Sequence, residues 1–310
     1  MAVQKFMNLE TLRAEQSLFF RIYILGSIFS ERTSHFMIDE LKVADHYRNL
    51  DLFDLIKNGL VKLGVSLDAV SITDLSRVDN FHVGGESATQ FVIDHLHLDA
   101  EKSILDIGCG IGGPARFIAQ SSGCMVCGID ITESYIETGI QLNTLVGLDK
   151  NVDLRHGSAL ALPYENSSFD GAYMIHVGMN IDDKNKLMSE AYRVLKAGSN
   201  FVLFDIMKEG DAEIDYPLPW AQSREESAVD LVQSYESGLS DAGFNILDTV
   251  DKNQFAVEFF ETLIEKMMKG GQKPLGLHLL MGKSTKDKVM NAHKQFKDGR
   301  LSPVLMIAQK

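Results

Sequence analysis

The stretch ILDIGCGIGG at residues 104–113 decides how this chain folds. It begins as an apolar run typical of a buried strand, continues through the glycines Gly108, Gly110 and Gly112, and leads into a helical pattern from Pro114. Glycines allow a tight turn and a close approach of ligand to backbone, and the N-terminus of the next helix presents free amides. The stretch therefore predicts a strand, a glycine-rich loop and a helix, with a nucleotide-like ligand at the carboxyl end of the strand.

Apolar runs alternate with segments of helical periodicity on both sides of this stretch. The runs predict strands at 103–107, 125–131, 151–155, 169–175, 200–206, 244–250 and 303–308. The segments between them predict helices at 114–121, 134–146, 184–195 and 225–242. Strands that alternate with helices favour a parallel sheet with helices on both faces. We therefore expect an α/β, doubly wound, Rossmann-like fold with a mostly parallel seven-stranded sheet.

Helical patterns flank this core and predict N-terminal and C-terminal caps. In the first of them, residues 9–41 read as an amphipathic helix, and a second apolar period runs from Leu52 to a stop at Gly64. The predicted division is an N-terminal cap or lid at 1–80, a ligand-binding core at 81–252, a helical cap inserted at 253–302 and the last core strand at 303–310.

Composition limits the class of protein. The 310 residues are 45% hydrophobic and carry a formal net charge of −13, which argues against a nucleic-acid binder because such proteins neutralise phosphates with cations. The apolar run at 18–29 contains Arg21 and is shorter than the roughly 20 residues that span a bilayer, so we expect no stable membrane insertion, although a membrane-surface helix is an alternative. Three cysteines are too few for a secreted disulfide scaffold, so a cytoplasmic location is expected.

Three features near the glycines narrow the ligand. Asp106 lies two residues before Gly108, where a carboxylate would repel a pyrophosphate and attract a cationic group. Asp130 lies twenty residues after Gly110, where a carboxylate can accept hydrogen bonds from both ribose hydroxyls. The loop GSALALP at 157–163 would flank an adenine ring. An adenosine with a cationic amino-acid tail is S-adenosylmethionine, which becomes the expected cofactor, whereas a nicotinamide dehydrogenase would leave Asp106 and this loop unexplained.

Further motifs follow in order along residues 80–250. Beside 104–113 and 157–163, they are GIDIT at 128–132, SFDGAYMIHV at 168–177 and RVLKAGS at 193–199. Together they resemble the class I S-adenosylmethionine-dependent methyltransferases. The segments DNFHVGGESAT at 79–89, HVGMNIDDK at 176–184, PLPWA at 217–221 and KDGRL at 297–301 are similar to a small-molecule branch described alongside sarcosine/dimethylglycine and phosphoethanolamine N-methyltransferases.

The resemblance implies which positions hold the cofactor and its product, S-adenosylhomocysteine. They are Phe81, His82, Asp106, Gly108, Gly110, Gly112, Asp130, Ile131, Ser158, Ala159 and His176. In this assignment Asp106 lies near the ammonium, Asp130 holds the ribose, and Ser158 meets the adenine. Many relatives have Asp in place of Ser158, and a hydroxyl is a weaker acceptor than a carboxylate.

Three positions are candidates for the chemistry. His176 follows the fourth strand, where a histidine could remove the acceptor's proton, although it could equally bind the cofactor or pack beneath it. Tyr47 resembles the lid tyrosine of phosphoethanolamine methyltransferases, which pairs with a histidine at the position of Asn180 here. This departure weakens the case for a phosphobase substrate. Tyr47 could also be structural, as many tyrosines are.

Other side chains could shape the acceptor site. Trp220 could form an aromatic wall for a cationic amine or a packing anchor between prolines. Five methionines could line an apolar pocket or belong to the core, namely Met179, Met207, Met267, Met268 and Met281. Cys124 and Cys127 would point to opposite faces of a strand, so no metal is expected.

The sequence thus predicts a methyltransferase that acts on a small-molecule acceptor by in-line displacement, with an amine nitrogen as the first choice. Oxygen, sulfur or carbon acceptors and a non-catalytic adenosylmethionine-binding protein are the alternatives. A homodimer is possible.

Overall fold

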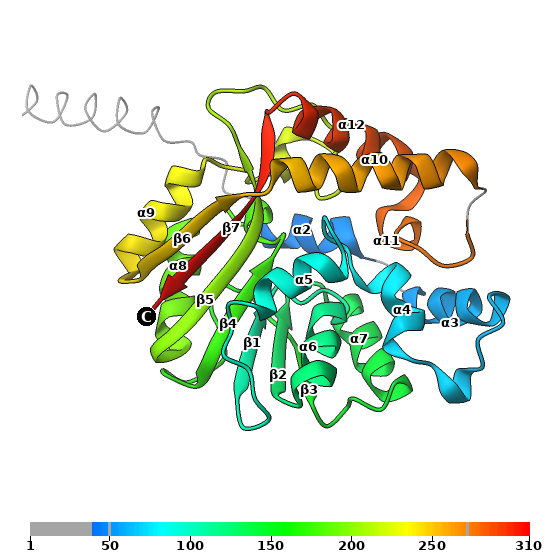
Figure 1. The fold of residues 1–310 in the computed structure, drawn as a ribbon, viewed down its shortest axis with the longest axis horizontal. Helices are drawn as coiled ribbons and strands as arrows, with labels where there is room; N and C mark the ends of the chain where they lie inside the picture. Colours follow the sequence, from blue (N-terminus) through cyan, green and yellow to red (C-terminus); the bar gives the residue numbers. More distant parts are fainter. Residues whose placement is uncertain (1–38, 49–50, 271–272) are drawn as a thin grey trace, which may run out of the picture. The chain divides into compact units, whose positions relative to one another are not determined.

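The computed structural model describes residues 39–48, 51–270 and 273–310. They build a seven-stranded sheet with the order β3-β2-β1-β4-β5-β7-β6, in which β7 is antiparallel to both of its neighbours (Figure 1). The strands are β1 Ser103–Ile107, β2 Met125–Asp130, β3 Val152–His156, β4 Phe169–Ile175, β5 Leu195–Lys208, β6 Asn245–Asp251 and β7 Leu301–Gln309. The predicted doubly wound, mostly parallel sheet is therefore confirmed, and β5 and β7 extend beyond the predicted runs.

Helices cover both faces of the sheet because its central strands are apolar on both sides. In β1, Ile104 packs under α5 (Glu86–Ile93), α6 (Gly113–Ser122) and α7 (Glu133–Leu145), while Leu105 packs against α8 (Lys184–Val194) and α9 (Val232–Ala242). Neighbouring residues of a strand point to opposite faces, so an unbroken apolar run supplies two cores.

The helix after the glycine loop begins and ends where local chemistry requires. Gly112 precedes α6 with a φ of +84°, a left-handed conformation that glycine adopts without strain. Pro114 lies in the first turn, where its missing N–H costs no helical hydrogen bond. Gly123, with a φ of +76°, ends the helix in a left-handed C-cap, and its N–H donates to Ala119 O. Helix α6 therefore begins directly after the glycine loop, and its N-terminus is directed toward the carboxyl end of β1.

The caps consist of helices from both ends of the described chain. From the N-terminal side come α2 (Glu40–Tyr47), α3 (Leu52–Lys62), the 3₁₀ turn η1 (Leu67–Ala69) and α4 (Ile72–Asp79). From the C-terminal side come α10 (Asn253–Lys269), α11 (His278–Met281), η4 (Gly282–Ser284) and α12 (Thr285–Lys297), and α10 and α12 pack side by side (Figure 1). The described residues form one compact unit, and the predicted domain boundaries within it stay a prediction.

Two expectations about helices need comment. The helix predicted at 225–242 is wrong in its first part: the structure has the 3₁₀ turn η3 (Arg224–Glu226), an extended stretch, and then α9. The chain is extended before α9 because Asp230 O accepts from Lys208 N, so that Leu231 bridges to the end of β5. Most of the amphipathic helix predicted at 9–41 lies outside the described residues.

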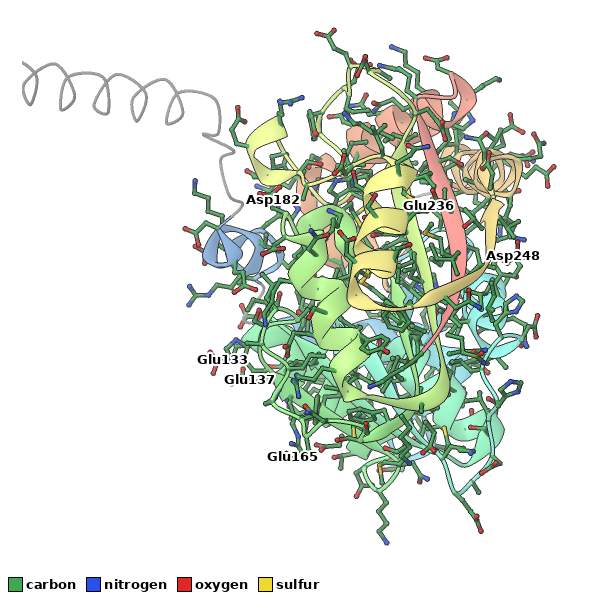
Figure 2. All side chains as sticks on the ribbon, turned by 90° about the vertical axis from the view of Figure 1, so that its left-hand side faces the viewer. Glu133, Glu137, Glu165, Asp182, Glu236 and Asp248 are labelled. Atoms are coloured by element: carbon green, nitrogen blue, oxygen red, sulfur yellow. The ribbon has the colours of Figure 1, made fainter. Side chains whose placement is uncertain are left out.

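The acidic residues behind the net charge are distributed over the surface. Figure 2 shows one face, on which carboxylates from several elements are labelled, namely Glu133, Glu137, Glu165, Asp182, Glu236 and Asp248. All six are at least partly exposed. No helix in the described part of the chain is long and apolar enough to cross a membrane.

Candidate active site

A cavity of about 180 Å³ lies at the carboxyl ends of β1, β2 and β4 and extends to the caps. It brings together most of the predicted site, since its lining includes Tyr47, Phe81, His82, Asp106, Gly108, Gly110, Asp130, Ile131, Ala159, His176 and Asn180. Gly112 and Ser158 are outside the lining. Parallel strands place their carboxyl ends at one edge of the sheet, which is why residues so far apart in sequence meet here.

The glycine loop forms a cradle at one end of this cavity. A Cβ at Gly108 would lie 2.3 Å from Cγ2 of Val177, so only glycine fits there. Gly110 has a φ of +54°, and a Cβ at this position would meet no atom within 4 Å, so its open side is available to a ligand. Gly112 has a different role, because a Cβ there would lie 2.9 Å from Leu154 Cδ1. Gly112 therefore serves the packing of the loop.

Asp106 places a buried carboxylate beside this cradle. Its side chain is on β1, the residue is 2% exposed, and Oδ2 accepts a hydrogen bond from the Tyr173 hydroxyl at 2.7 Å. Burial raises the pKa of Asp106 to about 7, although the hydrogen bond from Tyr173 opposes this shift. A cationic group bound nearby would favour the ionised carboxylate. The site thus fits the ammonium of an amino-acid tail.

Asp130 holds the loop and the start of α7 together. Its Oδ2 accepts from Gly110 N at 2.9 Å, and its Oδ1 accepts from Thr132 N at 2.8 Å. Burial raises the pKa of this carboxyl, and the two amides oppose the shift. Each carboxylate oxygen has a second lone pair, so Asp130 can still accept from a diol. Its role in organising the loop was not foreseen in the sequence.

Polar atoms without partners line the same cavity. Tyr135 Oη and His176 Nε2 are buried and have no hydrogen-bond partner within the described residues. Buried polar atoms are nearly always satisfied, so these atoms indicate where a bound ligand supplies partners. Sequence reasoning missed Thr132 and Tyr135, although their position two and five residues after Asp130 was a usable signal.

His176 follows β4 in a left-handed conformation with a φ of +56°, which is uncommon for a residue with a side chain. Nδ1 accepts from Val83 N at 3.5 Å, so the neutral ring carries its proton on Nε2. Burial, and then the neighbouring His82, lower the pKa of His176 well below its usual value. The geometry therefore favours a neutral hydrogen-bond donor over the proton acceptor suggested by the sequence.

Helix α2 lies across the cavity, and polar contacts at both of its ends hold it there. Tyr47 donates to Asn180 Oδ1 at 3.4 Å, which brings the two predicted catalytic positions together. Burial raises the pKa of Tyr47, so its hydroxyl stays protonated at neutral pH. At the other end of α2, Ser158 donates to Glu40 in a short hydrogen bond. The resemblance assigned the Ser158 hydroxyl to the adenine, but in the structure this hydroxyl is hydrogen-bonded to Glu40.

The cap end of the cavity is apolar. Trp220 is 4% exposed, lines the cavity and donates from Nε1 to Ser227 Oγ at 3.0 Å. Met179 and Met281 also line it, as predicted. Met207 belongs to the sheet core, which was the other alternative. Neither alternative holds for Met267 and Met268, which are 37% and 79% exposed on α10.

A buried polar network supports the turn after β4. This turn, η2 (Gly178–Asn180), is anchored because Gly178 N and Tyr235 Oη donate to the Asp205 carboxylate, the latter at 2.7 Å. A Cβ at Gly178 would lie 2.3 Å from Asp205 Oδ2. Lys184 also holds the region by donating to Ala228 O at 3.0 Å. Sequence reasoning missed Asp205 and Tyr235, since a strand residue and a helix residue thirty positions apart show no motif.

The cysteines do not form a metal site in this structure. All three are free, and no group of three or more His, Cys, Asp or Glu side chains within the described ranges could hold a metal ion.

Similarity to known proteins identifies the family. A family model described as a methyltransferase domain matches residues 105–203, which include the glycine loop, Asp130 and His176. An O-methyltransferase (resE) of Aspergillus sclerotiorum is 32% identical over 181 residues, which cover 57% of this chain and 68% of that protein. This chain belongs to the class I S-adenosylmethionine-dependent methyltransferases.

Solved structures agree with the methyltransferase fold. A geranyl diphosphate C-methyltransferase of Streptomyces coelicolor A3(2), crystallised with Mg²⁺, geranyl diphosphate and S-adenosylhomocysteine, superposes with a TM-score of 0.61 at 18% identity over 73% of this chain and 78% of its own. A putative sarcosine dimethylglycine methyltransferase of Galdieria sulphuraria has a TM-score of 0.57 at 22% identity over 72% of this chain and 83% of its own. This methyltransferase spans only 32% to 66% of the length of the first curated relatives it matches.

Proposed function

We propose that this methyltransferase binds S-adenosylmethionine at the glycine-loop end of the cavity and transfers its methyl group to a small molecule at the cap end. The observation that carries the proposal is the buried carboxylate of Asp106 beside Gly108 and Gly110, in a cavity that also contains Asp130. The cofactor supplies a methyl group on a sulfonium, which a nucleophile of the acceptor displaces in line.

The chain's own residues act by binding and positioning. Asp106 would pair with the ammonium of the cofactor, and Asp130 would accept from its ribose while it keeps Gly110 in place. Ala159 and Ile131 would contact the adenosine, and Phe81 and His82 would cover the methionine end. His176 would donate from Nε2 to a ligand oxygen, because Nδ1 already accepts from Val83 N.

Tyr47 and Asn180 would orient the acceptor. Both side chains line the cavity and are neutral at pH 7, so they offer hydrogen bonds without a charge. Helix α2 covers this part of the cavity and would exclude water from it. Exclusion of water favours this displacement, because the charge of the sulfonium is dispersed in the transition state. Catalysis would therefore rest on proximity and orientation, which can supply several kcal/mol of the barrier.

The finer predictions remain to be tested. An amine nitrogen is the acceptor atom suggested by the sequence, and oxygen, sulfur or carbon are the alternatives. The homodimer, the cytoplasmic location and the lack of nucleic-acid binding likewise stay predictions.

The direct test is calorimetry of the purified chain with S-adenosylmethionine, followed by a screen of acceptors that measures release of S-adenosylhomocysteine. We expect micromolar binding of the cofactor and acceptor-dependent release. Binding of the cofactor without turnover of any acceptor would favour the non-catalytic alternative. No binding of the cofactor would refute the proposal.

A further inference from the structure

The cap end of the cavity is walled by hydrocarbon side chains from three helices of the C-terminal cap. Lining residues there include Phe259 and Leu263 of α10, Leu280 and Met281 of α11, and Val289 and Phe296 of α12. Trp220 adds an aromatic surface. Apolar walls stabilise a ligand by removing its hydrocarbon surface from water, which contributes roughly 25 cal/mol for each Å² buried. A polar ligand gains little from such a wall.

Cationic groups that could recognise an anionic acceptor do not line this end in the described part of the chain. The described residues that line the cavity include no lysine or arginine. Lys288 is a buried residue of α12, but it is outside the lining and its Nζ donates to Met281 O at 3.4 Å. An anionic head such as a phosphate would therefore be buried without a cation, which is costly.

The carboxylates of the described lining are all engaged by other groups of the chain. Asp79 pairs with Arg116 at 2.7 Å, and Glu40 accepts from Ser158. Asp106 and Asp130 belong to the glycine-loop end, where they are assigned to the cofactor. A cationic amine in the apolar end would thus meet Trp220, but no free carboxylate among the described residues.

Uncharged polar groups also line this cavity, among them Tyr47, Tyr135 and His176. Burial raises the pKa values of Tyr47 and Tyr135 and lowers that of His176, so all three are neutral at pH 7. Tyr135 Oη and His176 Nε2 lack partners within the described residues. Such groups can hydrogen-bond a neutral oxygen or nitrogen of a ligand.

We propose that the acceptor is a neutral, largely hydrocarbon molecule, which lies against α10, α11 and α12 and turns one polar or unsaturated group toward Tyr47, Asn180 and His176. This inference rests on the proposed function, because it assigns the acceptor to the end of the cavity that the cofactor leaves free.

The only tryptophan of the chain provides the measurement, because Trp220 lines the cavity and its emission reports on the occupant. The full-length chain is titrated with 1-octanol, octylamine and octanoate at pH 7, with and without saturating S-adenosylhomocysteine. The three probes share a chain and differ in charge, since the amine is protonated and the acid ionised at this pH. We expect octanol to bind at least ten-fold more tightly than either ion.

A pair of variants on α10 locates the binding. Leu263→Glu adds a carboxylate to the apolar wall and should weaken octanol at least ten-fold while it strengthens octylamine. Met268→Glu adds the same charge to the same helix at a site that is 79% exposed, and it should change neither affinity.

Several results would overturn the inference. Tighter binding of octylamine or octanoate than of octanol to the wild-type chain would show that the acceptor carries a charge. Equal octanol affinity in Leu263→Glu and Met268→Glu would place the hydrocarbon elsewhere. Binding of S-adenosylhomocysteine without any change on adding octanol would refute the acceptor class and leave the proposed function intact, whereas failure to bind S-adenosylhomocysteine would refute both.

Discussion

At the glycine-loop end of the cavity, the contacts join residues that are close in sequence, such as Gly110 with Asp130 and Asp130 with Thr132. At the cap end, the walls come from α2, from the segment after β5 and from α10 to α12, which are more than two hundred residues apart at the extremes. One end is a rigid set of backbone and carboxylate contacts, and the other is a set of packed hydrocarbon side chains. We infer that substitutions at the first end change cofactor affinity steeply, while the second end tolerates changes in size.

The largest effect is expected for Asp106→Asn. Loss of the buried charge should weaken S-adenosylmethionine binding by about 2 to 4 kcal/mol, or roughly 30- to 1000-fold. Since the pKa of Asp106 is raised to about 7, the wild-type affinity should rise as the pH increases from 6 to 7.5, where the carboxyl loses its proton. The variant should lose this rise.

Calorimetry at several pH values measures both effects. Asp153→Asn, at a partly exposed position of β3 outside the cavity lining, is the control and should bind like the wild type. A variant with the same pH-dependent rise as the wild-type chain would assign the ammonium to another group.

A second test separates backbone strain from close contact. Gly108→Ala should lower cofactor affinity about ten-fold or more. The new Cβ would lie 2.3 Å from Val177, and the alanine would also have to adopt the positive φ of this position. Gly147→Ala has a similar φ of +71° but an open surrounding, so it should cost about 1 to 2 kcal/mol of stability and leave affinity unchanged. Urea unfolding and calorimetry on both variants check this, and equal losses of affinity would contradict the cradle.

His176 lines the same cavity, and its variants test the hydrogen-bond donor role. His176→Ala should reduce kcat by about ten-fold, the cost of one neutral hydrogen bond, and His176→Gln should recover part of it. Because the pKa of His176 is held well below 6.5, neither variant should alter the pH profile of kcat between pH 6 and 9. If the pH profile of kcat had an acidic limb in the wild type that His176→Ala lost, His176 would be the proton acceptor after all.

The smallest effect is expected at the cap side, for the pair Tyr47 and Asn180. Their hydrogen bond is long at 3.4 Å, so Tyr47→Phe and Asn180→Ala should each raise KM by about two- to five-fold. A double-mutant cycle should give a coupling of about 0.5 to 1 kcal/mol. Additive effects would mean that the two side chains orient the acceptor independently.

Sequence reasoning succeeded where the determinants are local. The strand, turn and helix around Gly108 and the helix stop at Gly64 follow from residue types at short spacing. The mostly parallel, doubly wound sheet follows from the alternation of strands with helices, and the family motifs add the positions of Asp106 and Asp130.

Properties that depend on distant partners were not accessible in the same way. Ser158 is a plausible adenine contact until Glu40, 118 positions away, takes its hydroxyl. Met267 and Met268 have helical spacing, but only the docking of α10 decides which side faces the cavity. The neutral state of His176 depends on burial beneath Val83 and His82, which a motif does not encode.

The position of β7 has a consequence for the order in which the chain folds. In the described sheet β6 pairs with β7 alone, and β7 follows it in sequence only after the whole α10 to α12 cap. Until β7 has been synthesised, the apolar edge of β5 is unpaired, and such an edge can recruit other chains. Pairing across this separation is slow, because loop closure must precede the contacts. The C-terminal cap and the last edge of the sheet are therefore completed together, and β5 keeps an unpaired edge until β7 is in place.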